Sequence, residues 1–339
     1  MAQGSMRAIE AHDFSIDSLK LGQRPVPKPR RGEILVRIKA ASLNYRDLAI
    51  LAQKYMASLA LPYVPASDAC GEVVEIGEEV TRFKVGDRVT PLYTQGWHDG
   101  YPTPEQRTKR TLGAPLTGVL QDYVVVPAEE AVSVPANLSD TEAATLPIAA
   151  LTAWSTLQEG SIKAGDTVLI QGTGGVALFA LQFARIMGAR VVALSSSDEK
   201  LARAKQLGAD VGINYRNIPA WGAAVKEATG GRGVDIVVET AGATMEQSLG
   251  AVAFGGFIGI VGFVAGMKAE IPLRTIIGPM IRIQGIAVGS RARFEAMNRA
   301  IALHKLKPVV DSTFPLEKTA EAFRHLEAGK HFGKIVIGL

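Results

Sequence analysis

The segment TVLIQGTGGVALFALQFARIMGA, residues 167–189, contains the strongest structural pattern in the chain. Its apolar run from Val168 to Ile170 is typical of a buried parallel strand. A glycine-rich turn follows, and apolar residues then recur at helical spacing from Val176 to Met187. The segment therefore predicts a strand, a tight loop and a helix.

The loop has the spacing G-x-G-x-x-A, formed by Gly172, Gly174 and Ala177. The first glycine allows a tight turn, the second lets a diphosphate approach the backbone, and the small third residue lets the helix pack closely on the strand. The helix N-terminus, with its free N–H groups, favours an anion. Because a second strand is expected at 190–197, we predict a dinucleotide-binding unit. Its loop contacts are expected from Gly172, Thr173, Gly174, Gly175 and Val176.

Length and composition restrict the class of protein. The 339 residues exceed one ordinary core, so about two domains are expected. A hydrophobic content of 47%, a charged content of 21% and 35 glycines are typical of a soluble α/β protein. The net charge of +4 is spread over interspersed basic and acidic residues, so no nucleic-acid-binding patch is predicted.

The single cysteine, Cys70, excludes a disulfide framework and a cysteine-rich zinc site, and it fits a reducing cytoplasm. No segment approaches 18 uninterrupted apolar residues, so no membrane association is expected. The N-terminus lacks the apolar region of a secretory signal, and residues 1–5, MAQGS, are interpreted as an expression scar. These features predict a cytoplasmic location.

The chain from Met6 to about Pro135 reads as short strands separated by turn residues, which predicts an all-β, barrel-like unit. Residues 44–56 have a helical pattern within it. The polar segment 94–118 is too long for a simple turn and is expected to form a lobe or lid.

The pattern changes near Asn137. Ser139 and Glu142 have the spacing of a capping box, so a long amphipathic helix is predicted over 138–157. Strands and helices then alternate, which predicts a doubly wound parallel sheet. Strands are expected at 211–215, 234–242, 248–263 and 281–290, and helices at 198–209 and 220–230.

With this central unit, the segment AATLPIAALTAWSTL before it and FGKIVIGL at the end, the chain resembles the medium-chain dehydrogenase/reductase superfamily from Met6 to Leu339. It is most similar to the zinc-free quinone oxidoreductase and zeta-crystallin branch. The resemblance implies a GroES-like catalytic domain of β-barrel type at 1–149 and 290–339, a Rossmann domain at 150–289, and an active site in the cleft. The expected fold class is therefore α/β.

Zinc members of the superfamily have a cysteine at the position of Asn44, a His-Glu pair at Ser67 and Asp68, and a third ligand at the position of Ile148. None of these residues provides the thiolate or imidazole that a catalytic zinc favours. The sequence therefore predicts no metal.

The end of the second Rossmann strand usually carries an acidic residue in NAD-selective proteins. Here Ser195, Ser196 and Ser197 hold that place, although Asp198 follows directly. Lys200 and Tyr215 resemble the lysine and tyrosine that bind the adenosine phosphate in NADPH-dependent quinone oxidoreductases. NADP(H) is therefore preferred, and NAD(H) stays open.

The resemblance also implies contacts near the nicotinamide. It places Thr152 under the ring, and further residues along the cofactor. Thr240 and Gly242 follow a strand at the sheet edge where ligands bind. The implied cofactor contacts are Thr152, Thr240, Gly262, Phe263, Val288, Gly289 and Ser290.

The resemblance assigns Asn44 and Tyr55 as the catalytic candidates, and Ser67 and Asp68 as substrate-cleft residues. A tyrosine phenol can donate a hydrogen bond to a carbonyl and can in principle deliver a proton. The neighbouring Arg46 and Asp47 are expected to form a structural ion pair or hydrogen bonds.

The predicted activity is zinc-independent hydride transfer from NADPH to a quinone or an α,β-unsaturated carbonyl compound, with hydrogen-bond donors in place of the metal. One alternative is a zinc-free alcohol dehydrogenase or aldehyde or ketone reductase. Another is a non-catalytic NADPH-binding structural or RNA-binding protein. The expected partners are a small-molecule substrate and a second copy of the chain, with a homodimer formed through an edge strand such as 279–288.

Overall fold

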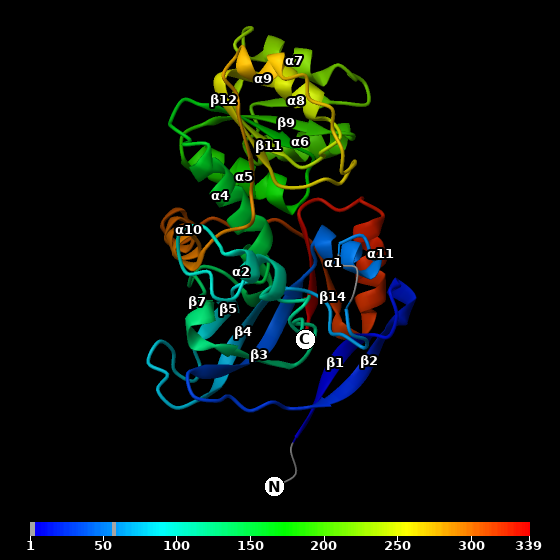
Figure 1. Ribbon diagram of the computed structural model, residues 1–339, viewed down its shortest axis with the longest axis vertical. Helices are drawn as coiled ribbons and strands as arrows, with labels where there is room; N and C mark the ends of the chain where they lie inside the picture. The colour runs from blue at the N-terminus through cyan, green and yellow to red at the C-terminus, as the bar shows by residue number, and fades with distance from the viewer. Residues whose placement is uncertain (1–3, 56–58) are drawn as a thin grey trace. The chain divides into compact units, whose positions relative to one another are not determined.

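The computed structural model describes residues 4–55 and 59–339 (Figure 1). The chain divides into two compact units, Met1–Ile148 with Gly289–Leu339, and Ala149–Val288. We call them the first and the second unit. No helix among the described residues has the length and apolar character that crossing a membrane requires.

The second unit contains a six-stranded sheet in the order β10-β9-β8-β11-β12-β13, and all its strand pairs are parallel. The doubly wound sheet is therefore confirmed. The chain order reverses between β8 and β11, which is the switch point at which such sheets bind ligands. The strands are β8 Thr167–Gln171, β9 Arg190–Ser195, β10 Val211–Asn214, β11 Val234–Glu239, β12 Val252–Ile260 and β13 Arg282–Gly285.

Helices connect these strands because parallel neighbours need a crossover. All five residues of β8 are buried, as expected for a strand covered on both faces. The expected strand at 248–263 is wrong in its first part, since residues up to Ala251 complete α8. The helices are α4 Leu151–Glu159, α5 Gly175–Ile186, α6 Asp198–Gln206, α7 Trp221–Ala228, α8 Met245–Ala251 and α9 Arg274–Ile277.

The first unit has a two-stranded sheet, β1 with β2, and a seven-stranded sheet in the order β14-β15-β3-β4-β5-β7, with β6 on β3. The last part of the chain, red in Figure 1, returns so that β15 pairs antiparallel with β3. The strands are β1 Ser5–Ala11, β2 Leu19–Pro25, β3 Glu33–Ser42, β4 Asp68–Ile76, β5 Arg88–Pro91, β6 Tyr123–Pro127, β7 Ala131–Ser133, β14 Val310–Pro315 and β15 Lys334–Gly338.

The first helix of the first unit is shorter than the sequence predicts. The pattern at 44–56 gives a helix only over Tyr45–Leu51, and Met56 lies outside the described residues. The segment 94–118 contains one short helix, α2. The helices are α1 Tyr45–Leu51, α2 Pro104–Lys109, α3 Asp140–Ala143, α10 Arg291–His304 and α11 Thr319–Glu327.

The predicted continuous helix over 138–157 is wrong. Ser139 and Glu142 do form the reciprocal capping box, which confirms the helix start. The helix α3 ends at Ala143, and a π-helical turn, Leu146–Ala150, separates it from α4. Pro147 lies in that turn, and it has no N–H to continue an α-helical ladder.

Candidate active site

The glycine loop lies at the carboxyl end of β8, directly before α5. Gly172 has a φ of +77°, a left-handed conformation that glycine adopts without strain. Gly174 is the N-cap residue of α5, and no side chain caps this helix end. A Cβ atom built on Gly172 or Gly174 would meet nothing within 4 Å. The loop therefore leaves free space in front of helix N–H groups that have no capping side chain.

Other predicted cofactor residues lie at the same edge of this sheet. Ser195 is the last residue of β9, and Ser196 follows it, while Thr240 follows β11. Gly262 and Phe263 come shortly after β12. Since β9, β8, β11 and β12 are consecutive parallel neighbours, their carboxyl ends meet at one edge.

A buried network that the sequence analysis did not identify fixes the backbone after β11. The amide nitrogen of Gln171 donates to Glu239 Oε2 at 2.7 Å, and its amide oxygen accepts from the N–H of Thr240 at 3.0 Å. The other carboxylate oxygen of Glu239 accepts from the N–H groups of Ala241 and Gly242 at 3.0 and 2.9 Å. These contacts fix the loop that carries Thr240.

The predicted adenosine-phosphate residues lie around the end of β9. The N–H of Tyr215 donates to the carbonyl of Ser195 at 3.1 Å, and the Tyr215 side chain is exposed. Lys200 lies in the first turn of α6. The Asp198 carboxylate accepts from the Asn214 amide at 2.9 Å, so it is already engaged by a neighbouring side chain.

The remaining cofactor candidates are divided between the units. Thr152 is buried on α4, and Val288, with a φ of +65°, is the last residue of the second unit. Gly289 and Ser290 belong to the first unit. There the Ser290 hydroxyl accepts from the N–H of Arg293 at 3.3 Å and caps α10.

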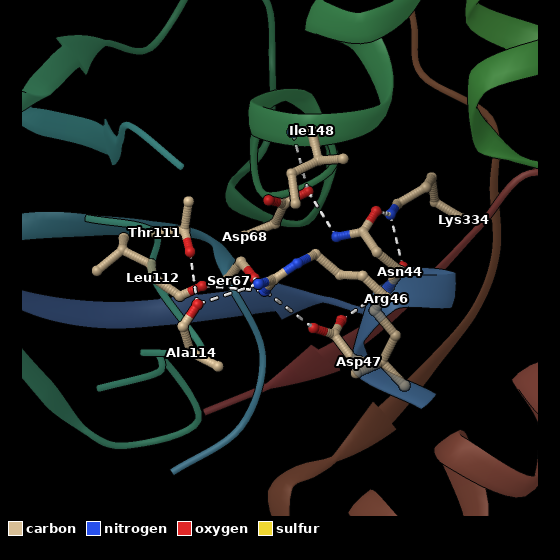
Figure 2. A network of polar contacts seen from close by, with 11 residues as sticks. Asn44, Arg46, Asp47, Ser67, Asp68, Thr111, Leu112, Ala114, Ile148 and Lys334 are labelled. Atoms are coloured by element: carbon tan, nitrogen blue, oxygen red, sulfur yellow. Dashed lines mark hydrogen bonds and ion pairs between the residues drawn. The ribbon is translucent and has the colours of Figure 1, made fainter. Parts of the chain in front are cut away.

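Strand register brings the polar residues of the first unit together. β3 lies between β15 and β4, with Ser42 opposite Val336 on one side and opposite Asp68 on the other. Asn44 follows the end of β3, and Lys334 is the first residue of β15. The three side chains therefore meet at the same end of the sheet (Figure 2).

Lys334, Asn44 and Asp68 form a hydrogen-bonded chain. The ammonium of Lys334 donates to the carbonyl of Leu43 at 2.5 Å and to Asn44 Oδ1 at 2.6 Å. The amide nitrogen of Asn44 donates to Asp68 Oδ2 at 3.0 Å. The N–H of Ile148 donates to the same oxygen at 3.2 Å.

Burial shifts the pKa values of the ionisable residues in and beside this hydrogen-bonded network. Desolvation raises the pKa of Asp68 to about 7, although the Lys334 charge and the Asn44 hydrogen bond act in the opposite direction. Desolvation also lowers the pKa of Lys334, against the attraction of Asp68 and Asp47. The pKa of Asp47 is raised for the same reason.

Arg46 organises the second half of the cluster. Its guanidinium donates to Ser67 Oγ at 2.6 Å and to the carbonyls of Leu112 and Ala114 at 3.0 and 3.2 Å. Its nearest approach to Asp47 is an ion pair at 3.9 Å, as expected from the sequence. Arg46 is buried, so these contacts attach the loop around residue 113 to α1.

The structure thus brings Asn44, Ser67 and Asp68 together and adds Lys334, which the sequence analysis missed. A lysine in the otherwise apolar run FGKIVIGL was the available signal. Tyr55 lies near Arg46 instead, with its ring centroid 5.5 Å from the guanidinium carbon, and its side chain is exposed.

Two family models match the chain, the alcohol dehydrogenase GroES-like domain over residues 30–136 and the zinc-binding dehydrogenase over residues 175–302. A zinc-type alcohol dehydrogenase-like protein of Schizosaccharomyces pombe is 43% identical over 95% of each chain. The chain belongs to the medium-chain dehydrogenase/reductase superfamily. Its expected GroES-like fold is thereby confirmed, and it is an NAD(P)-dependent oxidoreductase of the alcohol dehydrogenase-like type.

Other members of the superfamily show the range of relatives. A solved structure assigned as an alcohol dehydrogenase of Sinorhizobium meliloti 1021 is 43% identical, covers 100% of both chains and has a TM-score of 0.93. Human quinone oxidoreductase is 28% identical over 99% of each chain. A mycobacterial structure complexed with NADPH is 27% identical over 98% of this chain and 100% of its own, with a TM-score of 0.82.

Proposed function

We propose that this superfamily member uses NADPH to reduce a quinone or an α,β-unsaturated carbonyl compound without a metal ion. The observation that carries the proposal is the set of residues in the first unit at the positions where zinc members have metal ligands. Where zinc members hold ligands, Asn44 and Ser67 accept hydrogen bonds from Lys334 and Arg46. The Asn44 and Ser67 side-chain oxygens, which could otherwise bind a metal ion, are thus hydrogen-bonded to cationic groups.

The side chains at these four positions do not form a zinc site. Ile148 has no ligand atom in its side chain, and Asp68 is the one carboxylate among the four positions. Among the residues that the structure describes, no group of three or more His, Cys, Asp or Glu side chains could hold a metal ion. The two buried cations, Lys334 and Arg46, already face the two buried carboxylates, Asp47 and Asp68, so the cluster has no excess negative charge to attract a divalent ion.

The second unit suits a dinucleotide. The open space at Gly174 and the uncapped start of α5 suit the diphosphate, and the absence of an acidic residue at the end of β9 suits a 2′-phosphate. When bound, NADPH supplies the hydride from C4 of its nicotinamide. Lys200 and Tyr215 are assigned to the phosphate that distinguishes NADPH from NADH.

The residues of the first unit favour an activated acceptor. Hydride addition places negative charge on the substrate oxygen, and hydrogen-bond donors stabilise that charge. Without zinc to acidify a bound alcohol, oxidation of plain alcohols loses its main activator. We assign Asn44, Ser67 and Asp68 to the acceptor site, and Tyr55 as a donor from the segment that follows α1.

The names of the more similar relatives favour a second candidate, a zinc-free alcohol dehydrogenase or aldehyde or ketone reductase. A titration with NADPH and NADH, followed by NADPH oxidation with quinones, enones and saturated aldehydes, separates the two functions. We expect tighter NADPH binding and faster turnover of quinones or enones. A clear preference for saturated aldehydes would support the second candidate.

Replacing Lys200 with alanine is expected to weaken NADPH binding by about 10- to 100-fold, because a charge-assisted hydrogen bond to phosphate contributes about 1.5–3 kcal/mol. NADH binding should change by less than about threefold. The two dissociation constants measure the effect, and Lys205→Ala at the exposed end of the same helix is the control. An equal loss of NADPH and NADH binding would contradict the assignment of Lys200 to the NADPH phosphate.

The chain is also proposed to form a homodimer through the second unit. β13 is an edge strand, and exposed apolar side chains lie in the stretch of chain from β12 to β13, at Phe254, Val264, Met267, Leu273, Ile277 and Met280.

Substituting both Leu273 and Ile277 with glutamate is expected to convert the dimer to a monomer, since it places charges on the apolar surface. Light scattering after gel filtration measures the mass. Leu303→Glu, at an equally exposed leucine on α10, is the control and should remain dimeric. A monomeric unmodified protein would exclude this interface.

A further inference from the structure

Lys334 determines the orientation of the Asn44 amide. A lysine ammonium can only donate hydrogen bonds, so the Asn44 atom facing it must be the oxygen. The amide nitrogen is then directed at Asp68, where it donates at 3.0 Å. The last strand of the fold therefore fixes which atom Asn44 presents to Asp68.

The two oxygens of Asp68 differ as a result. Oδ2 accepts from both the Asn44 amide and the N–H of Ile148. Oδ1 is turned away from both donors in Figure 2, and it is buried with no hydrogen-bond partner. Because a buried polar atom without a partner is costly, Oδ1 is the oxygen of this carboxyl that is available for a further hydrogen bond.

The surroundings favour a proton on Oδ1 when Asp68 is neutral. Oδ2 already receives two N–H groups, so the proton of the acid form belongs on the other oxygen. The charged groups facing the carboxyl are Lys334 from β15, which lowers its pKa, and Asp47 from α1, which raises it, and burial raises the pKa by more than Lys334 lowers it. In its acid form, Asp68 presents an O–H donor from the position that a glutamate holds in zinc members.

We propose that Asp68 donates a hydrogen bond from Oδ1 to the carbonyl oxygen of the substrate, and that Asn44 and Lys334 are positioning residues for this donor. The inference rests on the proposed function. The hydride adds to the β-carbon, the double-bond electrons move toward the substrate oxygen, and Asp68 stabilises the resulting charge while keeping its proton. Solvent supplies the proton that completes the product at the α-carbon.

Two Asp68 variants test the donor directly through kcat/KM for an enone with NADPH between pH 5.5 and 9. Wild type should lose activity about tenfold per pH unit above about 7, as Asp68 ionises. Asp68→Leu, which has no donor, should lose about 100-fold at pH 6. Asp68→Asn places a permanent N–H donor at the Oδ1 position, so it should lose less than about tenfold at pH 6 and show no alkaline fall.

Lys334 variants test the positioning role. Removing the ammonium in Lys334→Met removes an interaction that lowers the Asp68 pKa, so the alkaline fall should move to higher pH. Lys334→Arg keeps the positive charge, so its kcat/KM should decrease above about the same pH as in the wild type. Lys318→Met, an exposed lysine paired with Glu321, is the control.

The outcomes distinguish a failure of the proposed function from a failure of the roles inferred for Asp68 and Lys334. If wild type binds NADPH but reduces no quinone or enone, the proposed function is wrong. If wild type is active and Asp68→Asn is as impaired as Asp68→Leu, or keeps the alkaline fall, the donor role of Asp68 is wrong. An unmoved pH profile in Lys334→Met would overturn the positioning role of Lys334. NADPH dissociation constants and melting temperatures of all variants exclude a loss of cofactor binding or folding.

Discussion

Replacing Gly174 with aspartate is expected to raise the NADPH dissociation constant by about 1000-fold, or about 4 kcal/mol, without unfolding the protein. The new side chain would occupy the open space before α5 and place a negative charge against the diphosphate. The backbone at this position is extended, with a φ of −80°, so any residue can adopt it. Aspartate is also a favourable N-cap residue, so the melting temperature should be unchanged or slightly higher.

The matched control for this variant is Gly250→Asp. Gly250 lies in α8, is exposed, and also has no atom within 4 Å of a built Cβ. Its substitution adds the same charge away from the glycine loop, so NADPH binding should stay within about threefold of wild type. Normal NADPH binding by a folded Gly174→Asp protein would show that the diphosphate lies elsewhere.

The largest stability effect is expected for Arg46→Met, at about 3–5 kcal/mol of unfolding free energy. The substitution removes the donors to Ser67, Leu112 and Ala114 and the cation nearest the buried carboxylate of Asp47. It also removes a guanidinium that lies over the Tyr93 ring, 4.9 Å from the ring centroid. Urea denaturation measures the loss.

The control for Arg46 is Arg31→Met. Arg31 pairs with Glu79 on the surface, where both side chains are more than 60% exposed. Such pairs contribute about 0–1 kcal/mol, so this variant should unfold close to wild type. An Arg46→Met protein as stable as Arg31→Met would refute the structural role assigned to the buried guanidinium.

The sequence predicts the second unit well because its signals are local. The apolar run before Gly172 and the helical spacing after it belong to one continuous segment, and the structure places β8 and α5 there. The capping box at Ser139 is likewise local and is present. Elements of this kind depend on residues only a few positions apart.

Two predictions fail where local patterns are ambiguous. Residues 248–251 are part of an apolar run that suits either a buried strand or a buried helix, and they complete α8. The pattern over 138–157 is amphipathic throughout, but Pro147 lies in the π-helical turn that interrupts it.

The polar cluster of the first unit is only partly predictable. Its members Asn44, Ser67 and Asp68 follow from the family resemblance. Lys334 is 290 positions from Asn44 in the chain, and the two meet because β15 pairs with β3 in one register. A one-residue slip would turn Lys334 to the other face of the strand. Long-range register of this kind cannot be read from spacing.

The most direct test of metal-free hydride transfer is to follow deuterium from C4-deuterated NADPH into an enone, using protein freed of metal by chelation. We predict that deuterium appears at the β-carbon of a saturated ketone product, one per NADPH consumed. Deuterium at the carbonyl carbon of an alcohol product, or transfer that requires added zinc, would contradict the account.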